Sequence, residues 1–176
     1  MTDPIAIKLG LLFEAVDADH DGTIHWADYQ RLFDRLAVGY KTDTAERRLQ
    51  ALQATYQMYW CELLRHADST SPLLTKEEFV AVNRMASMDI SRFNVVEGIP
   101  SAMFDVIVPD DSNILGMEEL SRLLKLLEVT SPEIAGRIPE LGNDGCVTRE
   151  DCVRSAREFF YTPNVIAPGG VFFGMV

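Results

Sequence analysis

The sequence predicts an all-α protein in which four helix–loop–helix units form two pairs. Three observations support this prediction. Apolar residues recur at three- and four-residue spacing over most of the chain, as on the buried face of an amphipathic helix. One twelve-residue loop between two such helices, residues 17–28, carries aspartates at alternate positions. Three further loops, starting near residues 67, 108 and 140, repeat parts of that pattern. Paired units share one core, which an isolated unit cannot build.

The first unit contains the most informative segment, which we call loop 1 (Asp17–Asp28). It is predicted to lie between helices at residues 4–16 and 26–36. Its carboxylates occupy positions 1, 3 and 5, and glycine stands at position 6, where an EF-hand calcium loop turns sharply. His25 stands at position 9, which often reaches the ion through a water. The predicted metal ligands are Asp17, Asp19, Asp21, Thr23 through its backbone carbonyl, and Asp28.

Asp28 departs from the usual calcium loop, which has glutamate at position 12. Its side chain is one methylene, about 1.5 Å, shorter. We expect it to bind through one oxygen or to pull the loop inward, and either change moves the preference from calcium toward magnesium. The alternative is a hydrated acidic turn, because Asp-Gly pairs are common in turns. The alternating aspartates, Ile24 at position 8 and the flanking apolar helices favour the metal site.

Loop 2 (Ala67–Glu78) is predicted to be structural. It lies between helices expected at about residues 44–66 and 79–91. Ala67 offers no ligand at position 1, and Pro72 replaces the glycine. Glu78 has a structural role that needs no metal, because Thr75-x-x-Glu78 is a capping box for the following helix.

Loop 3 (Val108–Glu119) and loop 4 (Glu140–Asp151) also depart from the pattern, and we expect both to be without metal. Val108 removes the first ligand of loop 3, which leaves a weak alternative site at Asp110, Ser112 and Glu119. Glu140 is oversized at position 1 of loop 4, and Gly142 has no side chain at position 3, although Asp144, Gly145 and Asp151 fit.

Helices are predicted at residues 101–107, 117–129 and 148–160, with another helix starting at Ser131-Pro132. The residues at position 8 of paired loops should meet in short antiparallel ladders, Ile24 with Leu74 and Leu115 with Val147.

The predicted organisation is an N-terminal pair over residues 1–92, a C-terminal pair over residues 93–160, and an apolar tail over residues 161–176. Proline and glycine exclude a continuous helix in the tail. Val171, Phe172 and Phe173 are apolar, so we expect the tail to pack back on the core. The alternative is a displaceable plug or a docking peptide for a partner.

The composition of the chain excludes several classes of partner and location. A net charge of −11 and a pI near 4.6 argue against nucleic acid and anionic membrane surfaces as partners. No apolar run has the length of a membrane span, and the first residues lack the pattern of a signal peptide. Three cysteines without metal-ligand spacing are expected to be reduced thiols. We therefore expect a cytoplasmic monomer.

The chain resembles the sarcoplasmic calcium-binding proteins, including their calerythrin-like bacterial members. The resemblance rests on loop 1, the degenerate loops, the long helix before loop 2 and the apolar tail. Aspartate at position 12 also occurs in that family. The resemblance implies a cytosolic, all-helical calcium-binding protein that acts as a calcium buffer or transporter. Members usually retain two or three intact loops, whereas this chain retains one, so a metal-stabilised protein with little buffering capacity is the other expectation.

The sequence does not indicate an enzyme, since it contains no nucleophile elbow, phosphate loop, CxxC pair or HExxH helix. The alternative to a buffer is a calcium sensor that exposes an apolar groove to a protein partner. Methionines would suit such an adaptable groove, although at helical spacing they are equally typical of a core. They are Met58, Met85, Met88, Met103 and Met117.

Overall fold

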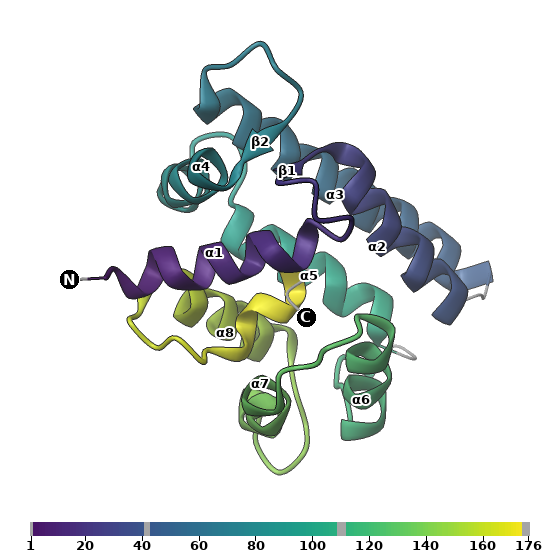
Figure 1. The fold of residues 1–176 in the computed structure, drawn as a ribbon. Coiled ribbons are helices and arrows are strands. Elements are labelled where there is room, and N and C mark those ends of the chain that lie inside the picture. Colours follow the sequence, from purple (N-terminus) through teal and green to yellow (C-terminus); the bar gives the residue numbers. More distant parts are fainter. Residues whose placement is uncertain (1, 41–42, 109–111, 174–176) are drawn as a thin grey trace.

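The computed structural model describes residues 2–40, 43–108 and 112–173, and helices make up most of them. In Figure 1, α1 crosses the centre of the molecule, with α4 on one side and α7 and α8 on the other. The elements are α1 (Pro4–Val16), β1 (Thr23–Ile24), α2 (Trp26–Gly39), α3 (Asp43–Ala67), β2 (Leu74–Thr75), α4 (Lys76–Met88), α5 (Val95–Ile107), α6 (Met117–Leu126), α7 (Pro132–Arg137), the 3-10 helix η1 (Ile138–Leu141), α8 (Arg149–Tyr161) and the 3-10 helix η2 (Pro168–Phe173).

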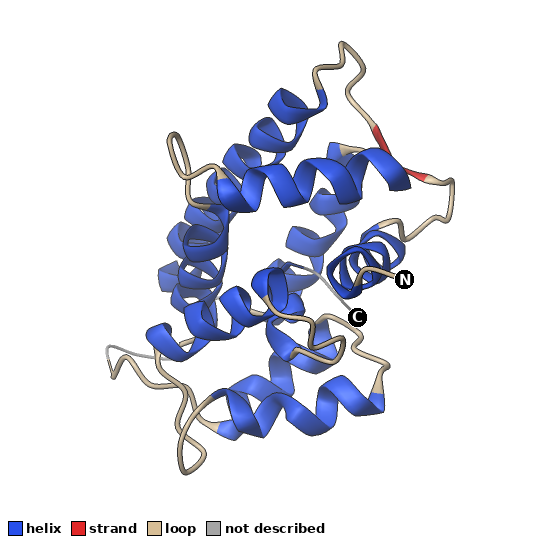
Figure 2. Ribbon diagram, turned by 90° about the vertical axis from the view of Figure 1, so that its left-hand side faces the viewer, coloured by secondary structure: helices blue, strands red, loops and turns tan. Residues whose placement is uncertain are grey.

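The loops pair as predicted. Strands β1 and β2 run antiparallel with Ile24 opposite Leu74, and they form the short ladder visible in Figure 2. In the second pair, Leu115 and Val147 form a single antiparallel bridge, with N–H···O distances of 2.8 and 2.9 Å in the two directions. All four side chains are fully or almost fully buried. The all-α fold with four units in two pairs is confirmed.

Two helices begin earlier than the sequence predicted. Helix α5 starts at Val95 rather than residue 101, because Asn94 caps it by accepting a hydrogen bond from the backbone N–H of Glu97. Pro100 lies inside this helix at the cost of one intrahelical hydrogen bond. Helix α4 starts at Lys76, immediately after its capping residue. The predicted start of α4 was too late because its first residues, Lys76, Glu77 and Glu78, are polar. The predicted start of α5 was too late because Pro100, in its second turn, was expected to precede the helix.

A cluster of aromatic rings fills the core and includes the last described residues. Phe172 and Phe173 of η2 are fully buried, and the Phe173 ring contacts three other rings, with its centroid 5.0 Å from that of Phe160. The Tyr56 hydroxyl of α3 donates a hydrogen bond to the Phe172 carbonyl. Gly169 lies directly on α8, where a Cβ would come 2.1 Å from the Ser155 carbonyl oxygen. Residues 174–176 of the predicted tail lie outside the described residues.

Helix α5 contacts α3, α8 and η2, so it connects the parts of the chain on either side of residue 92. The domain boundaries expected at residues 92 and 160 stay predictions.

Within the ranges that the structure describes, no helix is both long and apolar enough to cross a membrane.

Lys8 is a charged residue inside the core. Its side chain is 0% exposed and its Nζ donates to the backbone carbonyls of Glu158 (3.3 Å) and Thr162 (2.6 Å) at the end of α8. The same nitrogen lies 5.3 Å from the centre of the Phe159 ring. A cation is favoured beside the last carbonyls of a helix. Lys8 therefore connects α1, the helix that leads into loop 1, to the start of the tail.

Burial lowers the pKa of Lys8 to about 8, with Glu158 opposing the shift. Because an unfolded lysine titrates near 10.4, the unfolded chain binds more protons than the folded chain between pH 8 and 10. The Lys8 contribution to the free energy of unfolding should then rise with pH in that window, by at most about 1.4 kcal/mol per pH unit. Burial raises the pKa of Cys152 and of the buried tyrosines, and these groups oppose the rise, so the Lys8 contribution is read as a difference between proteins. We expect the free energy of unfolding of wild type, measured with urea, to increase from pH 8 to 10 relative to that of Lys8→Met, but not relative to that of Lys76→Met, which removes an exposed lysine. A difference between wild type and Lys8→Met that does not change with pH would contradict the assignment.

Candidate metal centre

Loop 1 leaves α1 at Asp17 and enters α2 after His25. The backbone turns between them at two residues with positive φ, His20 (56°) and Gly22 (84°). Gly22 occupies the position where the calcium loop needs this conformation, which costs glycine little. The two helices and the β1 strand therefore hold the predicted ligands of loop 1 on one compact turn.

Three carboxylates converge inside this turn. One oxygen of each of Asp17, Asp19 and Asp21 lies within 4.8 Å of the others. Asp17 is only 2% exposed, and its two oxygens accept from the backbone N–H groups of Asp21 (3.2 Å) and Gly22 (3.0 Å). The Asp21 carboxylate accepts from the backbone and hydroxyl of Thr23, both at 2.8 Å. These bonds hold the carboxylates close together in spite of their mutual repulsion.

Asp28, the predicted ligand at position 12, has both oxygens engaged. Its carboxylate is 0% exposed. Oδ2 accepts from the backbone N–H of His25 at 2.9 Å and lies 3.2 Å from His25 Nδ1. Oδ1 accepts from the guanidinium of Arg31, one helical turn later, at 3.0 Å. Asp28 thus caps α2 and forms an ion pair at the same time.

The same guanidinium also reaches the ligand at position 3, since a second nitrogen of Arg31 donates to Asp19 Oδ2 at 2.9 Å. This hydrogen bond lowers the pKa of Asp19 and raises that of Arg31. Arg31 was not among the residues that the sequence pattern predicted for the site. The available signal was an arginine three residues after the acid at position 12, because side chains at that spacing meet on a helix.

The donor set fits a hard divalent cation. Four aspartates and one arginine give residues 17–31 a formal charge of −3 when His20 and His25 are neutral. Calcium and magnesium both prefer such oxygen donors. Asp17, Asp19 and Asp21 would hold the ion through carboxylates, Thr23 through its carbonyl, and Asp28 on release from Arg31. The ion would neutralise carboxylates that otherwise repel one another.

A second cluster of possible ligands lies between α3 and α4, at Glu62, His66 and Asp89. The guanidinium of Arg65 occupies its centre, 2.6 Å from oxygens of both acids and 3.1 Å from the His66 ring. Hydrogen bonds from Ser91 and Arg65 hold the pKa of Asp89 well below its usual range. This arrangement is an ion-pair network that joins two helices rather than an open metal site.

In loop 2, Glu78 caps α4 by accepting a hydrogen bond from the Thr75 N–H at 2.9 Å, as predicted.

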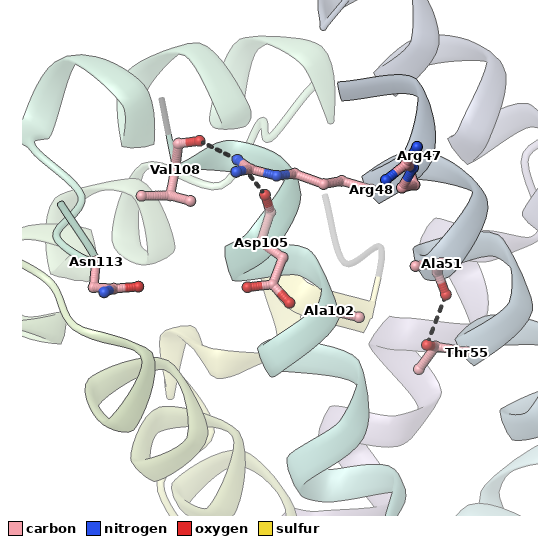
Figure 3. A pocket seen from close by; sticks show the side chains of 8 residues that line it. All are labelled: Arg47, Arg48, Ala51, Thr55, Ala102, Asp105, Val108 and Asn113. Atoms are coloured by element: carbon pink, nitrogen blue, oxygen red, sulfur yellow. Dashed lines mark hydrogen bonds between the residues drawn. The ribbon is translucent and has the colours of Figure 1, made fainter. Parts of the chain in front are cut away.

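Loop 3 begins beside a cavity of about 530 Å³ between α3 and α5 (Figure 3). Arg48 extends from α3 along this cavity and donates to the backbone carbonyls of Asp105 (3.2 Å) and Val108 (3.1 Å). Position 1 of loop 3 is therefore Val108, whose backbone carbonyl accepts a hydrogen bond from Arg48. Asp110, which the weak alternative site requires, lies outside the described residues, so that site stays a prediction.

In loop 4, Asp151 occupies position 12 and accepts from the Thr148 backbone N–H at 2.9 Å. Its other oxygen accepts from Arg154 at 2.5 Å, and Arg154 also donates to the Leu141 carbonyl at 3.3 Å. Gly142 at position 3 has no room for a ligand side chain, because a Cβ there would lie 2.0 Å from the Cys146 carbonyl oxygen. The start and the end of loop 4 are therefore joined by an arginine.

Paired helix–loop–helix units with a ladder between their loops define the EF-hand class of fold, which this chain has. The photoprotein clytin is similar in structure, with a TM-score of 0.76 and 15% identity over 96% of this chain and 93% of clytin. A sarcoplasmic calcium-binding protein from amphioxus (TM-score 0.65, 18% identity, 100% and 99% covered) is similar too. So is the coelenterazine-binding protein of Renilla muelleri (TM-score 0.63, 17% identity, 100% of both chains).

At these identities the likeness establishes the fold alone. It confirms the four-unit architecture that the resemblance to sarcoplasmic calcium-binding proteins implied. No protein-family model and no curated protein matches the sequence.

Proposed function

We propose that this chain is a non-enzymatic calcium-binding protein whose one complete site is loop 1. The observation that carries the proposal is the convergence of three aspartate oxygens within 4.8 Å on a turn with EF-hand spacing. The proposed ligands are Asp17, Asp19, Asp21, the Thr23 carbonyl and Asp28. The presence of calcium-binding proteins among the structural neighbours supports the choice of ion. Magnesium is proposed as a competitor at the same site, because Asp28 is short and is held by its own helix.

The proposed role is that of a metal-stabilised protein or a calcium buffer in the cytoplasm, as a monomer. One site in a 19.8 kDa chain gives little buffering capacity, which favours the metal-stabilised role. Val108 at position 1 of loop 3 and Gly142 at position 3 of loop 4 offer no ligand side chain, which supports a single site as well.

A calcium sensor is the second candidate, and exposed apolar residues near the end of α4 favour it. Met85, Met88 and Ile90 are 46%, 71% and 66% exposed, whereas Met103 is fully buried in the core and does not contribute to a groove. A sensor would bind more of a dye specific for apolar surface when calcium is added. Unchanged dye fluorescence on calcium addition would count against this role.

The coelenterazine-binding protein among the neighbours is named for an organic ligand. In this chain Phe172 and Phe173 of η2 occupy the aromatic core, with the Phe172 carbonyl bound by Tyr56. The proposal therefore concerns an ion and not an internal organic ligand.

The test is a calorimetric calcium titration of metal-stripped protein, repeated in millimolar magnesium. We expect one site, weaker in magnesium, that is absent in Asp17→Ala. The matched control is Asp144→Ala, which removes a carboxylate from loop 4 and should leave binding unchanged. Binding that persists in Asp17→Ala but disappears in Asp144→Ala would move the site to loop 4. Two or more sites in wild type would restore the buffer role.

A further inference from the structure

The guanidinium of Arg31 lies where two of the predicted ligands meet. It bonds to Asp28 Oδ1 at 3.0 Å and to Asp19 Oδ2 at 2.9 Å, and so joins positions 3 and 12 of loop 1. The remaining Asp28 oxygen accepts from the His25 N–H. A metal ion that used Asp28 would compete with these donors for the same two oxygens. Arg31 therefore makes the same connection, between the first half and the last residue of the loop, that a bound cation makes.

Loop 4 contains the same arrangement independently. Arg154 follows Asp151 by three residues, as Arg31 follows Asp28, and each position-12 carboxylate gives one oxygen to a backbone N–H and the other to the arginine. Loop 4 has glycine at position 3, so Arg154 reaches the backbone carbonyl of Leu141 instead of a ligand side chain. The bond between the position-12 carboxylate and the arginine therefore occurs both with and without a carboxylate at position 3.

We propose that Arg31 is an internal competitor of the metal ion, which lowers the calcium affinity of loop 1 and holds the loop closed without metal. This inference rests on the proposed function of loop 1 and concerns how that site is regulated. Three effects act in the same direction. Arg31 occupies carboxylate oxygens that the ion needs, and its positive charge repels the ion. In addition, it reduces the repulsion among the aspartates, which would otherwise favour uptake of a cation.

The test compares the calcium affinity of wild type and Arg31→Gln by calorimetry in low-salt buffer. Glutamine keeps polar contacts but removes the charge. The Arg31 side chain is 42% exposed, so folding should survive the change. We expect affinity to rise on the order of tenfold, as Coulomb's law gives for a single and a double charge several ångströms apart in a water-like dielectric. The ratio should fall toward one at about 1 M salt, where the Debye length is only about 3 Å.

Three further variants complete the experiment. Arg31→Lys keeps the charge but not the planar fork, so its affinity should lie between those of wild type and Arg31→Gln. Arg154→Gln changes the equivalent arginine of loop 4 and should leave calcium affinity unchanged. In the absence of metal, Arg31→Gln should melt at a lower temperature than wild type, because it lacks the bridge between Asp19 and Asp28.

The outcomes separate the inference from the function on which it rests. If wild type binds calcium and Asp17→Ala does not, but Arg31→Gln binds no more tightly than wild type, the inference is overturned and the function stands. An equal gain in Arg154→Gln would also overturn it, because the effect would then reflect overall charge. Absence of binding in wild type and in Arg31→Gln would overturn the proposed function together with the inference. Binding that is detectable only in Arg31→Gln would support the competition directly.

Discussion

Replacing Phe173 with alanine is expected to lower the free energy of unfolding by about 3–5 kcal/mol, the usual cost of removing a buried phenylalanine. The ring is fully buried and contacts Tyr59, Phe159 and Phe160, with centroid distances of 5.9, 6.5 and 5.0 Å. These partners come from α3 and α8, so the cavity would open between two helices. A domain is stable by only about 5–15 kcal/mol, and the loss would therefore be a large fraction of the total.

Urea unfolding measures this loss as a lower midpoint with a similar slope. The control is Val165→Ala in the same terminal segment, where the side chain is 42% exposed and the change should stay within about 0.5 kcal/mol. Equal, small effects of the two variants would mean that the terminal segment does not contribute to the core in solution. A much shallower slope in Phe173→Ala would indicate that the change affects the unfolded ensemble as well.

Calcium is expected to stabilise the protein by an amount set only by its concentration and Kd. A ligand that binds only the folded state contributes about 2.7 kcal/mol at a hundredfold excess over Kd and about 4.1 kcal/mol at a thousandfold excess. The ion should therefore raise Tm, and Asp17→Ala should abolish the rise. The physical reason is the position of Asp17, whose buried carboxylate is placed at the start of loop 1 by its bonds to the N–H groups of Asp21 and Gly22.

The measurement is a thermal melt with and without calcium, for wild type, Asp17→Ala and the loop 4 control Asp144→Ala. Asp17→Ala also loses two hydrogen bonds in the metal-free state, so each protein is compared with its own metal-free melt. The control should keep the full shift. A shift that is retained in Asp17→Ala would contradict the assignment of the site to loop 1.

Much of the architecture was predictable because it depends on local pattern. Proline at the first position of α1 and α7 and the capping residues of α4 and α8 mark helix starts within a few residues of chain. The residues at position 8 predicted both loop contacts, Ile24 with Leu74 and Leu115 with Val147, because an EF-hand pair has a constant register. The start of α5 was wrong since Asn94 caps the helix and Pro100 lies within it.

The candidate ligands of loop 1 could also be chosen from sequence, because a twelve-residue turn brings its own side chains together whatever the rest of the fold does. The hydrogen-bond partners of these carboxylates could not be predicted in this way. Arg31 bonds to Asp19, twelve residues away, and this contact depends on how α2 is oriented relative to loop 1. The spacing of Asp28 and Arg31 was visible in the sequence, but it does not say which carboxylates share the guanidinium.

The sequence by itself determined the units, their pairing and one set of candidate oxygen ligands, since each follows from residues close together in the chain. Tertiary structure alone decided which charges face one another and what fills the core. Lys8 contacts the end of α8 across 150 and 154 residues, and Tyr56 contacts Phe172 across 116 residues. Contacts of this kind depend on the relative placement of packed helices, which apolar spacing in a single helix does not specify.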